Sequence, residues 1–361
     1  MIAQVGSPRH VLCPPRAPVG PIRSVGSGQD LGGAVTKCVS KEIIRPQISF
    51  QRRLNGETKM AEINLTSRIR LQNIVLATDF SDASRAAIGY AAAIARTYQG
   101  RVYIVHVIPP EVYWWVPPES LSEAEESVQE SARLHMEELL VSEQLRDIPH
   151  EGIIKHGEIW DGLQPVVNQH KIDVIVTGTR GRRGPQKLVM GSVAEEILRL
   201  SSVPVLTVHP EAAQTSAHDP HTILFPTDFS ADSMRALAYA LSLAQEFQSC
   251  MIFLHVAPSM HNDPEVRNRL QAFFSDQLRQ IIPGETHAWC EQQVVVEFGD
   301  PSQAILQCAN GHKADLIVMG VRGAGSMVRA STHFGSTAHR VISAARAPVL
   351  SVRPLQQEIL Q

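Results

Sequence analysis

Two glycine clusters, one in each half of the sequence, have the residue types and spacing of an anion-binding loop. In the first cluster two residues separate Gly178 from Gly181, and nine more lead to Gly191 and Ser192, where an amphipathic stretch begins. Glycine permits a positive φ or a close approach of the backbone to a ligand. Consecutive backbone N–H groups in front of a helix N-terminus attract phosphate. The spacing therefore predicts a phosphate-binding loop.

The second cluster departs from this spacing. Gly320 and Gly323 keep the two-residue interval, but eleven residues precede Gly335 and Ser336, and Thr337 stands where the first cluster has a valine. Two extra residues could bulge harmlessly or could displace the N–H groups from the phosphates. Whether the second cluster binds a phosphate stays open from the sequence.

Other kinds of chemistry have little support. The sequence contains neither G-x-x-x-x-G-K-[ST] nor a G-x-G-x-x-G fingerprint. We can pick out no nucleophile–base pair, no clustered metal ligands and no paired carboxylates. Catalysis, beyond a slow hydrolysis of bound nucleotide, is therefore not predicted.

An internal repeat shows which elements must position the two clusters. "NIVLATDFSDASRAAIGYAAAIA" at 73–95 recurs as "TILFPTDFSADSMRALAYALSLA" at 222–244, so that Asp79 and Asp228 are 149 residues apart. Gly178 and Gly320 are 142 apart, which places seven extra residues in the first copy. The repeat predicts domains at 68–210 and 219–355, joined by a polar linker.

Each copy alternates short apolar runs with amphipathic stretches. "NIVLAT", "VYIVHVI", "DVIVTG" and "VPVLTV" are runs typical of buried parallel strands. Between them, Ser81 or Asp82 can cap a helix that stops near Gly100, and a long polar helix is expected at about 120–146. Alternating strands and helices predict a parallel sheet with helices on both faces.

With these elements in place, the sequence resembles the universal stress protein family. The resemblance rests on the first glycine spacing and on three short motifs that occur in both copies: "TDFS" at 78–81 and 227–230, "HV" at 106–107 and 255–256, and "PVL" at 204–206 and 348–350. It implies an α/β fold of two tandem, doubly wound, parallel five-stranded sheets with strand order 3-2-1-4-5. The domains would pair through their last strands as an intramolecular pseudo-dimer, with which a further homo-oligomer is compatible.

The resemblance also implies a ligand, ATP, with any Mg²⁺ held by its phosphates. The ribose or base would meet the aspartate after the first strand, adenine would meet backbone after the histidine, and the phosphates would meet the glycine loop. The implied residues are Asp79, Val107, Gly178, Gly181, Gly191, Ser192 and Val193 in the first copy, and Asp228, Val256, Gly320, Gly323, Gly335 and Ser336 in the second.

Structural roles compete with functional ones at several positions. Asp79 could instead cap the following helix. His106 and His255 follow strand interiors, and we expect both to be satisfied structural histidines. We expect Trp114 and Trp115 to pack under the long polar helix, the alternative being a lid or a partner surface.

Composition and charge narrow the remaining possibilities. A net charge of −3 gives no support for nucleic-acid binding. The apolar runs are too short for a membrane span. Five scattered cysteines fit a reducing cytoplasm.

Residues 1–67 read as a disordered or non-native extension. Residues 1–60 contain nine Lys/Arg and three Asp/Glu, scattered among Pro and Gly without a sustained period. A basic tail for an acidic partner, an organellar presequence and a translation start at Met60 are the alternatives.

The leading functional hypothesis is a cytoplasmic stress protein that binds an adenine nucleotide and acts as a sensor or adaptor on a protein partner that the sequence does not identify. The alternatives are a nucleotide-independent scaffold and a slow ATP hydrolase.

Overall fold

The computed structural model describes residues 48–54, 57–63, 69–179, 190–214, 218–259, 263–321 and 335–353. In the first half the strands are β3 (Asn73–Ala77), β4 (Arg101–Ile108), β5 (His150–His156), β6 (Val174–Gly178) and β7 (Val205–Val208). The helices are α1 (Asp82–Tyr98), α2 (Leu121–Leu140), α3 (Ile159–Gln169) and α4 (Ser192–Leu200).

The second half repeats this order. Its strands are β8 (Thr222–Pro226), β9 (Cys250–Ala257), β10 (Gln292–Phe298), β11 (Leu316–Gly320) and β12 (Val349–Val352). Its helices are α5 (Ala231–Phe247), α6 (Pro264–Ile281), α7 (Pro301–Gly311) and α8 (Ser336–Ala344).

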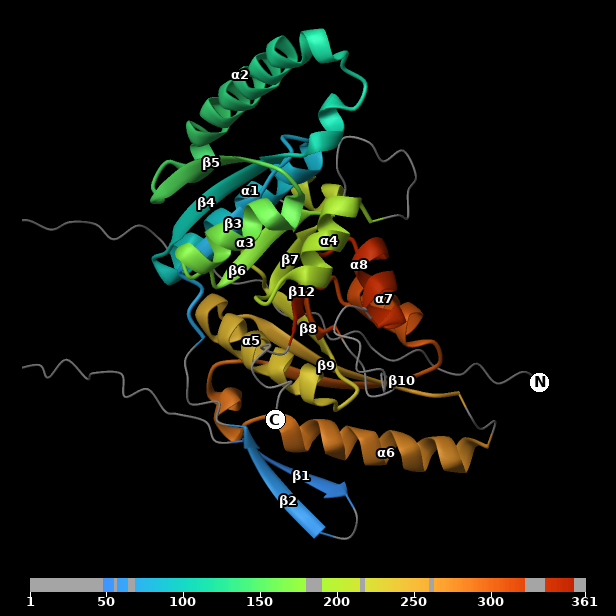
Figure 1. The fold of residues 1–361 in the computed structure, drawn as a ribbon. Helices are drawn as coiled ribbons and strands as arrows, with labels where there is room; N and C mark the ends of the chain where they lie inside the picture. Colours follow the sequence, from blue (N-terminus) through green and yellow to red (C-terminus); the bar gives the residue numbers. More distant parts are fainter. Residues whose placement is uncertain are drawn as a thin grey trace, which may run out of the picture.

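Among the described residues, these strands form one ten-stranded sheet in the order β10-β9-β8-β11-β12-β7-β6-β3-β4-β5. Each half contributes five parallel strands in the predicted order 3-2-1-4-5. The two halves meet where β12 pairs antiparallel with β7, Leu350 lying opposite Leu206 (Figure 1). The predicted fold class is confirmed, with both sheets continuous across the join.

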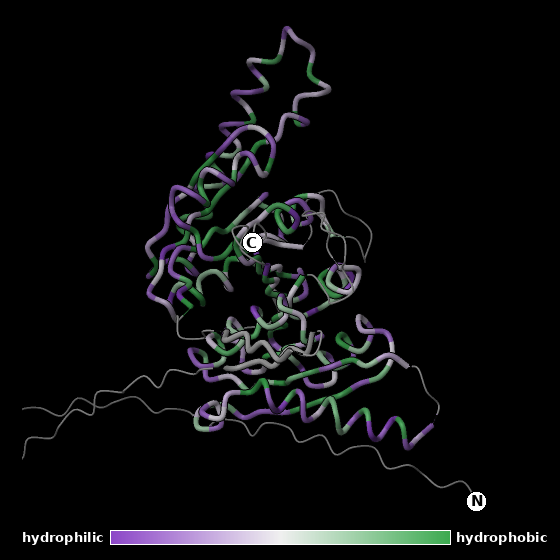
Figure 2. The backbone as a smooth tube through the Cα atoms, turned by 60° about the horizontal axis from the view of Figure 1, so that its bottom comes forward, coloured by the Kyte–Doolittle hydropathy of each residue, from purple (hydrophilic) through white to green (hydrophobic). Residues whose placement is uncertain are grey.

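Helices cover both faces of the sheet because alternate strand residues point to opposite sides. In β3, Ile74 and Leu76 pack in a core with α1, α2, α5 and α6. Val75 and Ala77 pack on the other face with α3, α4, α7 and α8. Each core runs through both halves of the chain. Figure 2 shows hydrophobic stretches (green) running through the interior of the molecule and many hydrophilic stretches (purple) along its outer coils.

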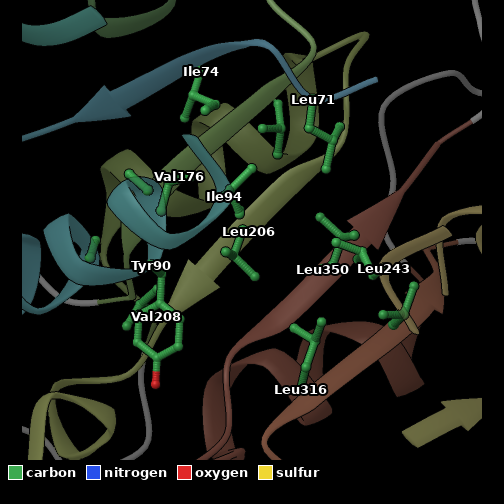
Figure 3. Packing of buried hydrophobic residues seen from close by; sticks show 14 of the residues in the cluster. Leu71, Ile74, Tyr90, Ile94, Val176, Leu206, Val208, Leu243, Leu316 and Leu350 are labelled. Atoms are coloured by element: carbon green, nitrogen blue, oxygen red, sulfur yellow. The ribbon is translucent and has the colours of Figure 1, made fainter. Parts of the chain in front are cut away.

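The join between the halves is an apolar seam. Leu206 and Leu350 are 3% and 2% exposed, and Leu243 and Leu316 from the second half lie near them (Figure 3). The hydroxyl of Tyr98 on α1 lies 3.4 Å from the hydroxyl of Ser242 on α5. The seam therefore buries two strand edges that separate domains would expose.

An antiparallel hairpin, β1 (Ile48–Leu54) with β2 (Glu57–Ile63), forms a separate two-stranded sheet. It falls within residues 1–67, for which we predict a disordered or non-native extension; the rest of that segment lies outside the described residues. Within the described ranges, no helix combines the length and apolar character needed to cross a membrane.

Candidate functional site

The loop between β3 and α1 is fixed by its own side chains. Thr78 accepts a hydrogen bond at Oγ1 from the backbone N–H of Phe80, and Asp79 accepts one at Oδ1 from that of Ser81, both at 3.0 Å. Ser81 then caps α1 by accepting from the N–H of Ser84. The N-cap is therefore Ser81, and Asp79 orients the cap residue. Phe80 adopts a φ of 62° at this tight turn.

His106 holds this loop to the neighbouring strand. Its Nδ1 donates to the carbonyl oxygen of Thr78 at 2.8 Å, and its ring lies 4.4 Å from that of Phe80. This hydrogen bond is the kind of contact expected of a structural histidine. The imidazole of His106 therefore fixes the position of Thr78, the residue that precedes Asp79.

The second half builds the same loop. Asp228 accepts from the N–H of Ser230, Ser230 caps α5, and His255 Nδ1 donates to the carbonyl oxygen of Thr227 at 2.9 Å. Burial is the main cause that lowers the pKa of His255, against the opposing effects of Thr227 and Asp228. The neutral imidazole is therefore favoured in this buried position.

Sequence reasoning missed a buried hydroxyl pair beneath each loop. Thr78 Oγ1 lies 3.0 Å from Ser84 Oγ, and Thr227 Oγ1 lies 2.9 Å from Ser233 Oγ. The signal was present, because the motif "TDFS" is followed in both copies by a serine six positions after the threonine.

Val107 and Val256 are presented at an open strand edge. The last β3–β4 pair is Ala77 with Val105, and β4 continues to Ile108. The N–H of Thr78 donates to the carbonyl of Val105, whereas Ile108 accepts from Gly157 on the β5 side. Backbone groups in a parallel strand alternate in direction, so those of Val107 face the β3 side, beyond the end of β3.

The same alternation holds for Val256. The N–H of Thr227 donates to Leu254, and Ala257 accepts from Gly299 on the β10 side. The backbone N–H and C=O of Val256 therefore face the edge beyond the end of β8. In each half this geometry places an amide donor and acceptor beside the aspartate loop, as the edge of an adenine base would require.

Gly178 and the N-terminus of α4 lie at the same edge of the sheet. Ala77 is in register with Thr177, so the ends of β3 and β6 are adjacent. The N–H of Gly191 donates to the carbonyl of Thr179 at 2.8 Å, which ties the start of α4 to the end of β6. The ends of two neighbouring strands and a helix N-terminus thus meet at one place.

The start of α4 is suited to an anion. Gly191 is the N-cap residue of α4 and has no side chain to cap the helix. The backbone N–H of Glu195 donates to the carbonyl oxygen of Gly191, which closes the first turn of the helix. The N–H groups of Ser192 and Val193 belong to the first turn, whose donors have no acceptor within the helix. In the second half, α8 begins in the same way at Gly335 and Ser336.

Backbone angles correct one part of the glycine argument. Gly191 has φ −67° and Gly335 has φ −62°, values that any L-residue can adopt. Neither glycine is needed for a positive φ. A requirement for glycine at these helix starts would therefore have to come from the space that a side chain would fill, and not from the backbone angle.

Gly320 has a packing explanation. A Cβ atom built on it would lie 2.8 Å from the carbonyl carbon of Asp232 and from the backbone N of Ser233. Because both contacts are with backbone at the start of α5, the absence of a side chain lets β11 and α5 approach each other. This reason holds whether or not a ligand binds there.

Two predicted site residues, Gly181 and Gly323, lie outside the described residues. The remaining eleven lie at the ends of strands, in the aspartate loops or at the starts of α4 and α8. In the part of the chain that the structure describes, no group of three His, Cys, Asp or Glu side chains could hold a metal ion.

The expectation that Trp114 and Trp115 pack under the long helix is wrong. Trp114 is 70% and Trp115 92% exposed, immediately after a short 3₁₀ helix, η1 (Pro110–Tyr113). Prolines flank the pair on both sides, at the starts of η1 and of a second 3₁₀ helix, η2 (Pro118–Ser120), which precedes α2.

The architecture defines a tandem α/β protein with a doubled candidate site at the carboxyl ends of its parallel strands. The model of the universal stress protein family matches residues 70–209 and 220–353. Because the two matches together cover most of the chain, the protein belongs to the universal stress protein family, as a tandem member.

Individual relatives agree with this assignment. A universal stress protein of Mycolicibacterium smegmatis is 26% identical over 293 residues, covering 78% of this chain and 97% of the relative. One from Thermus aquaticus is 34% identical over 139 residues, covering 37% of this chain and 98% of the relative. The crystal structure of a universal stress protein from Archaeoglobus fulgidus superposes with a TM-score of 0.58 at 24% identity, covering 77% and 97% of the two chains, and supports the fold.

Proposed function

We propose that this universal stress protein binds ATP at the carboxyl edge of the first half. The observation that carries the proposal is the meeting of three features: the Asp79 loop, the backbone of Val107 facing the edge beyond β3, and the start of α4 at Gly191. A nucleotide needs three kinds of partner: backbone groups for the edge of the adenine base, a hydrogen-bond acceptor for the ribose, and N–H donors for the phosphates.

The role of each group follows from its chemistry. The N–H and C=O of Val107 pair with the adenine edge, and Asp79 accepts from the ribose or the adenine amine. The N–H groups of Ser192 and Val193 meet the phosphates, favoured by the positive end of the helix dipole. Any Mg²⁺ arrives with the nucleotide and is held by its phosphates.

The second half has the same aspartate loop and strand edge, at Asp228 and Val256, and the same helix start at Gly335. Its glycine loop is two residues longer. We therefore place the stronger site in the first half. Binding would let the protein act in the cytoplasm as a sensor or adaptor whose surface responds to nucleotide.

Calorimetric titration of ATP into the full chain tests the proposal, with Gly191→Val and Gly335→Val as a matched pair. Both positions have φ values that valine adopts, so neither change strains the backbone. In Gly191→Val the added side chain occupies the phosphate position, and we expect the affinity to fall about a hundredfold. Gly335→Val should change it little.

Three outcomes separate the alternatives. If wild-type protein gives no heat on titration and carries no nucleotide after purification, the ATP-binding proposal is wrong and the nucleotide-independent scaffold becomes the better hypothesis. A greater loss in Gly335→Val would move the site to the second half. Release of inorganic phosphate from bound ATP would point to the slow hydrolase.

A further inference from the structure

Two exposed tryptophans stand at the start of a highly acidic helix. Trp114 and Trp115 are 70% and 92% exposed, and Glu119 follows them before α2. Indole rings in contact with water are unfavourable, and exposed aromatic clusters mark interaction sites. We call these tryptophans and the glutamates of the first half of α2 the acidic tryptophan surface.

The first half of α2 adds charge to this surface and makes little use of the core. The buried residues of α2 are Ala132, Met136 and Leu139, all in its second half. Four acidic side chains at its start are exposed: Glu119, just before α2, and Glu123, Glu125 and Glu126 within its first two turns. Among the described residues none of these four carboxylates forms an ion pair, whereas Arg133, farther along α2, pairs with Glu130 and Glu137.

The corresponding helix of the second half lacks this character. The helix α6 has three arginines, Arg267, Arg269 and Arg279, against Glu265 and Asp276. Both helices flank the sheet in equivalent positions (Figure 1). The acidic tryptophan surface is therefore a specialisation of the first half, and the fold does not require it.

The chemistry of the surface selects a cationic occupant. Carboxylates attract Lys and Arg, and indole faces are the best aromatic partners for their cations. Residues 1–47 of this chain contain six Lys/Arg and two Asp/Glu. In the sequence they are followed by the hairpin of β1 and β2, in which Ile48 pairs with Ile63, and then by Ile69, which packs against the core.

The weakness of the individual contacts favours an occupant that belongs to the same chain. Exposed ion pairs and exposed cation–π contacts are each weak, so a separate peptide would bind with a dissociation constant on the order of millimolar. A covalent connection to the same chain supplies an effective concentration of the same order, which a dilute partner protein does not. A 47-residue segment can extend roughly 150 Å, far more than the roughly 30 Å length of a 20-residue helix.

We infer that the basic segment 1–47 docks in cis on the acidic tryptophan surface. The docked segment covers Trp114 and Trp115 and neutralises the glutamates beside them. Because the contacts are ionic and exposed, salt releases the segment.

Acrylamide quenching of tryptophan fluorescence tests the inference in a Trp289→Phe background, because Trp289 is half-buried, Trp160 is buried, and the exposed pair then dominates the quenching. Docking at about half occupancy predicts that quenching of the exposed pair rises about twofold between low and high salt. Glu123→Gln/Glu126→Gln should show the high-salt value at low salt. The matched control Glu265→Gln/Asp276→Asn, on α6, should behave as wild type.

Zero-length carbodiimide cross-linking identifies the occupant. At low salt we expect amide bonds from Lys37 or Lys41 to the glutamates of the surface, within one chain, located by mass spectrometry. Cross-links between isotopically distinct copies would overturn docking in cis in favour of a second copy. Quenching that neither salt nor the glutamate changes alter, with no such cross-link, would also overturn it.

Discussion

Thr207 donates a hydrogen bond from its Oγ1 to the carbonyl oxygen of Val349, 3.2 Å away and 142 positions later in the chain. The two residues are also partners in the antiparallel ladder between β7 and β12. A buried side chain thus reinforces the ladder at the one antiparallel junction of the ten-stranded sheet in the described residues. The two halves share a core because of this junction.

The seam should contribute strongly to stability. Leu350→Ala removes a side chain that is 2% exposed and packed between the halves, so we expect a loss of about 2–5 kcal/mol in the free energy of unfolding. Chemical denaturation measures it. Leu134→Ala, at a position 53% exposed on α2, is the control. Equal effects of the two changes would contradict the packing of the seam.

Separation of the halves should expose the edges of β7 and β12. Each half expressed alone is expected to dimerise through its last strand or to aggregate, because an unpaired edge is a template for further pairing. Size-exclusion chromatography with light scattering distinguishes the states. Two soluble, monomeric halves would contradict this prediction, because they would show that the edges of β7 and β12 can remain unpaired in solution.

Gly320 should be required for packing as well as for any ligand. Gly320→Ala places a Cβ 2.8 Å from the backbone of α5, and relief of the clash should cost about 1–3 kcal/mol in the free energy of unfolding. The control is Gly311→Ala, where a Cβ meets nothing within 4 Å. Thermal melts without nucleotide isolate this effect. A neutral Gly320→Ala would refute the packing explanation.

Acidification should weaken the fold through His255. Burial lowers its pKa in the folded protein, so the unfolded chain, with a histidine pKa of about 6.5, binds the proton first. Stability is therefore full above that pH and is lost as the pH falls toward the folded pKa. His255→Gln should flatten this dependence in melts between about pH 7.5 and 5.

Part of the dependence of stability on pH should remain in His255→Gln, because burial also lowers the pKa of His218. The exposed His156→Gln, at the end of β5, is the control. If the melting temperature of wild type and His255→Gln fell in parallel with acidification, His255 would not be the group responsible.

Local pattern was sufficient for the order of strands and helices. The apolar run before Thr78 and the stripe after Ser81 each satisfy a periodicity within a few residues, so β3 and α1 could be predicted from sequence. The repeat then carried the same elements to the second half. The resemblance to a known family supplied the strand order, which local pattern alone does not contain.

The candidate site was predicted in part. Asp79 and Gly191 could be proposed from motif and spacing, but the direction of the Val107 backbone depends on which strand lies on each side of β4. The negative φ of Gly191 and the packing role of Gly320 likewise depend on neighbours distant in sequence. The spacing in the sequence identifies which glycines are candidates for a site, but only the packing around each glycine shows whether it serves a ligand, a backbone angle or the contact between two elements.

The sequence by itself determined the two α/β units, their repeated loops and the uneven charge between the N-terminal segment and the rest. Each of these follows from residue types and intervals within one stretch of chain. The tertiary structure decided that β7 joins β12, that His106 serves the Thr78 carbonyl, and that Trp114 faces water. These depend on contacts between segments many residues apart, because burial and hydrogen-bond partners exist only once the chain has packed.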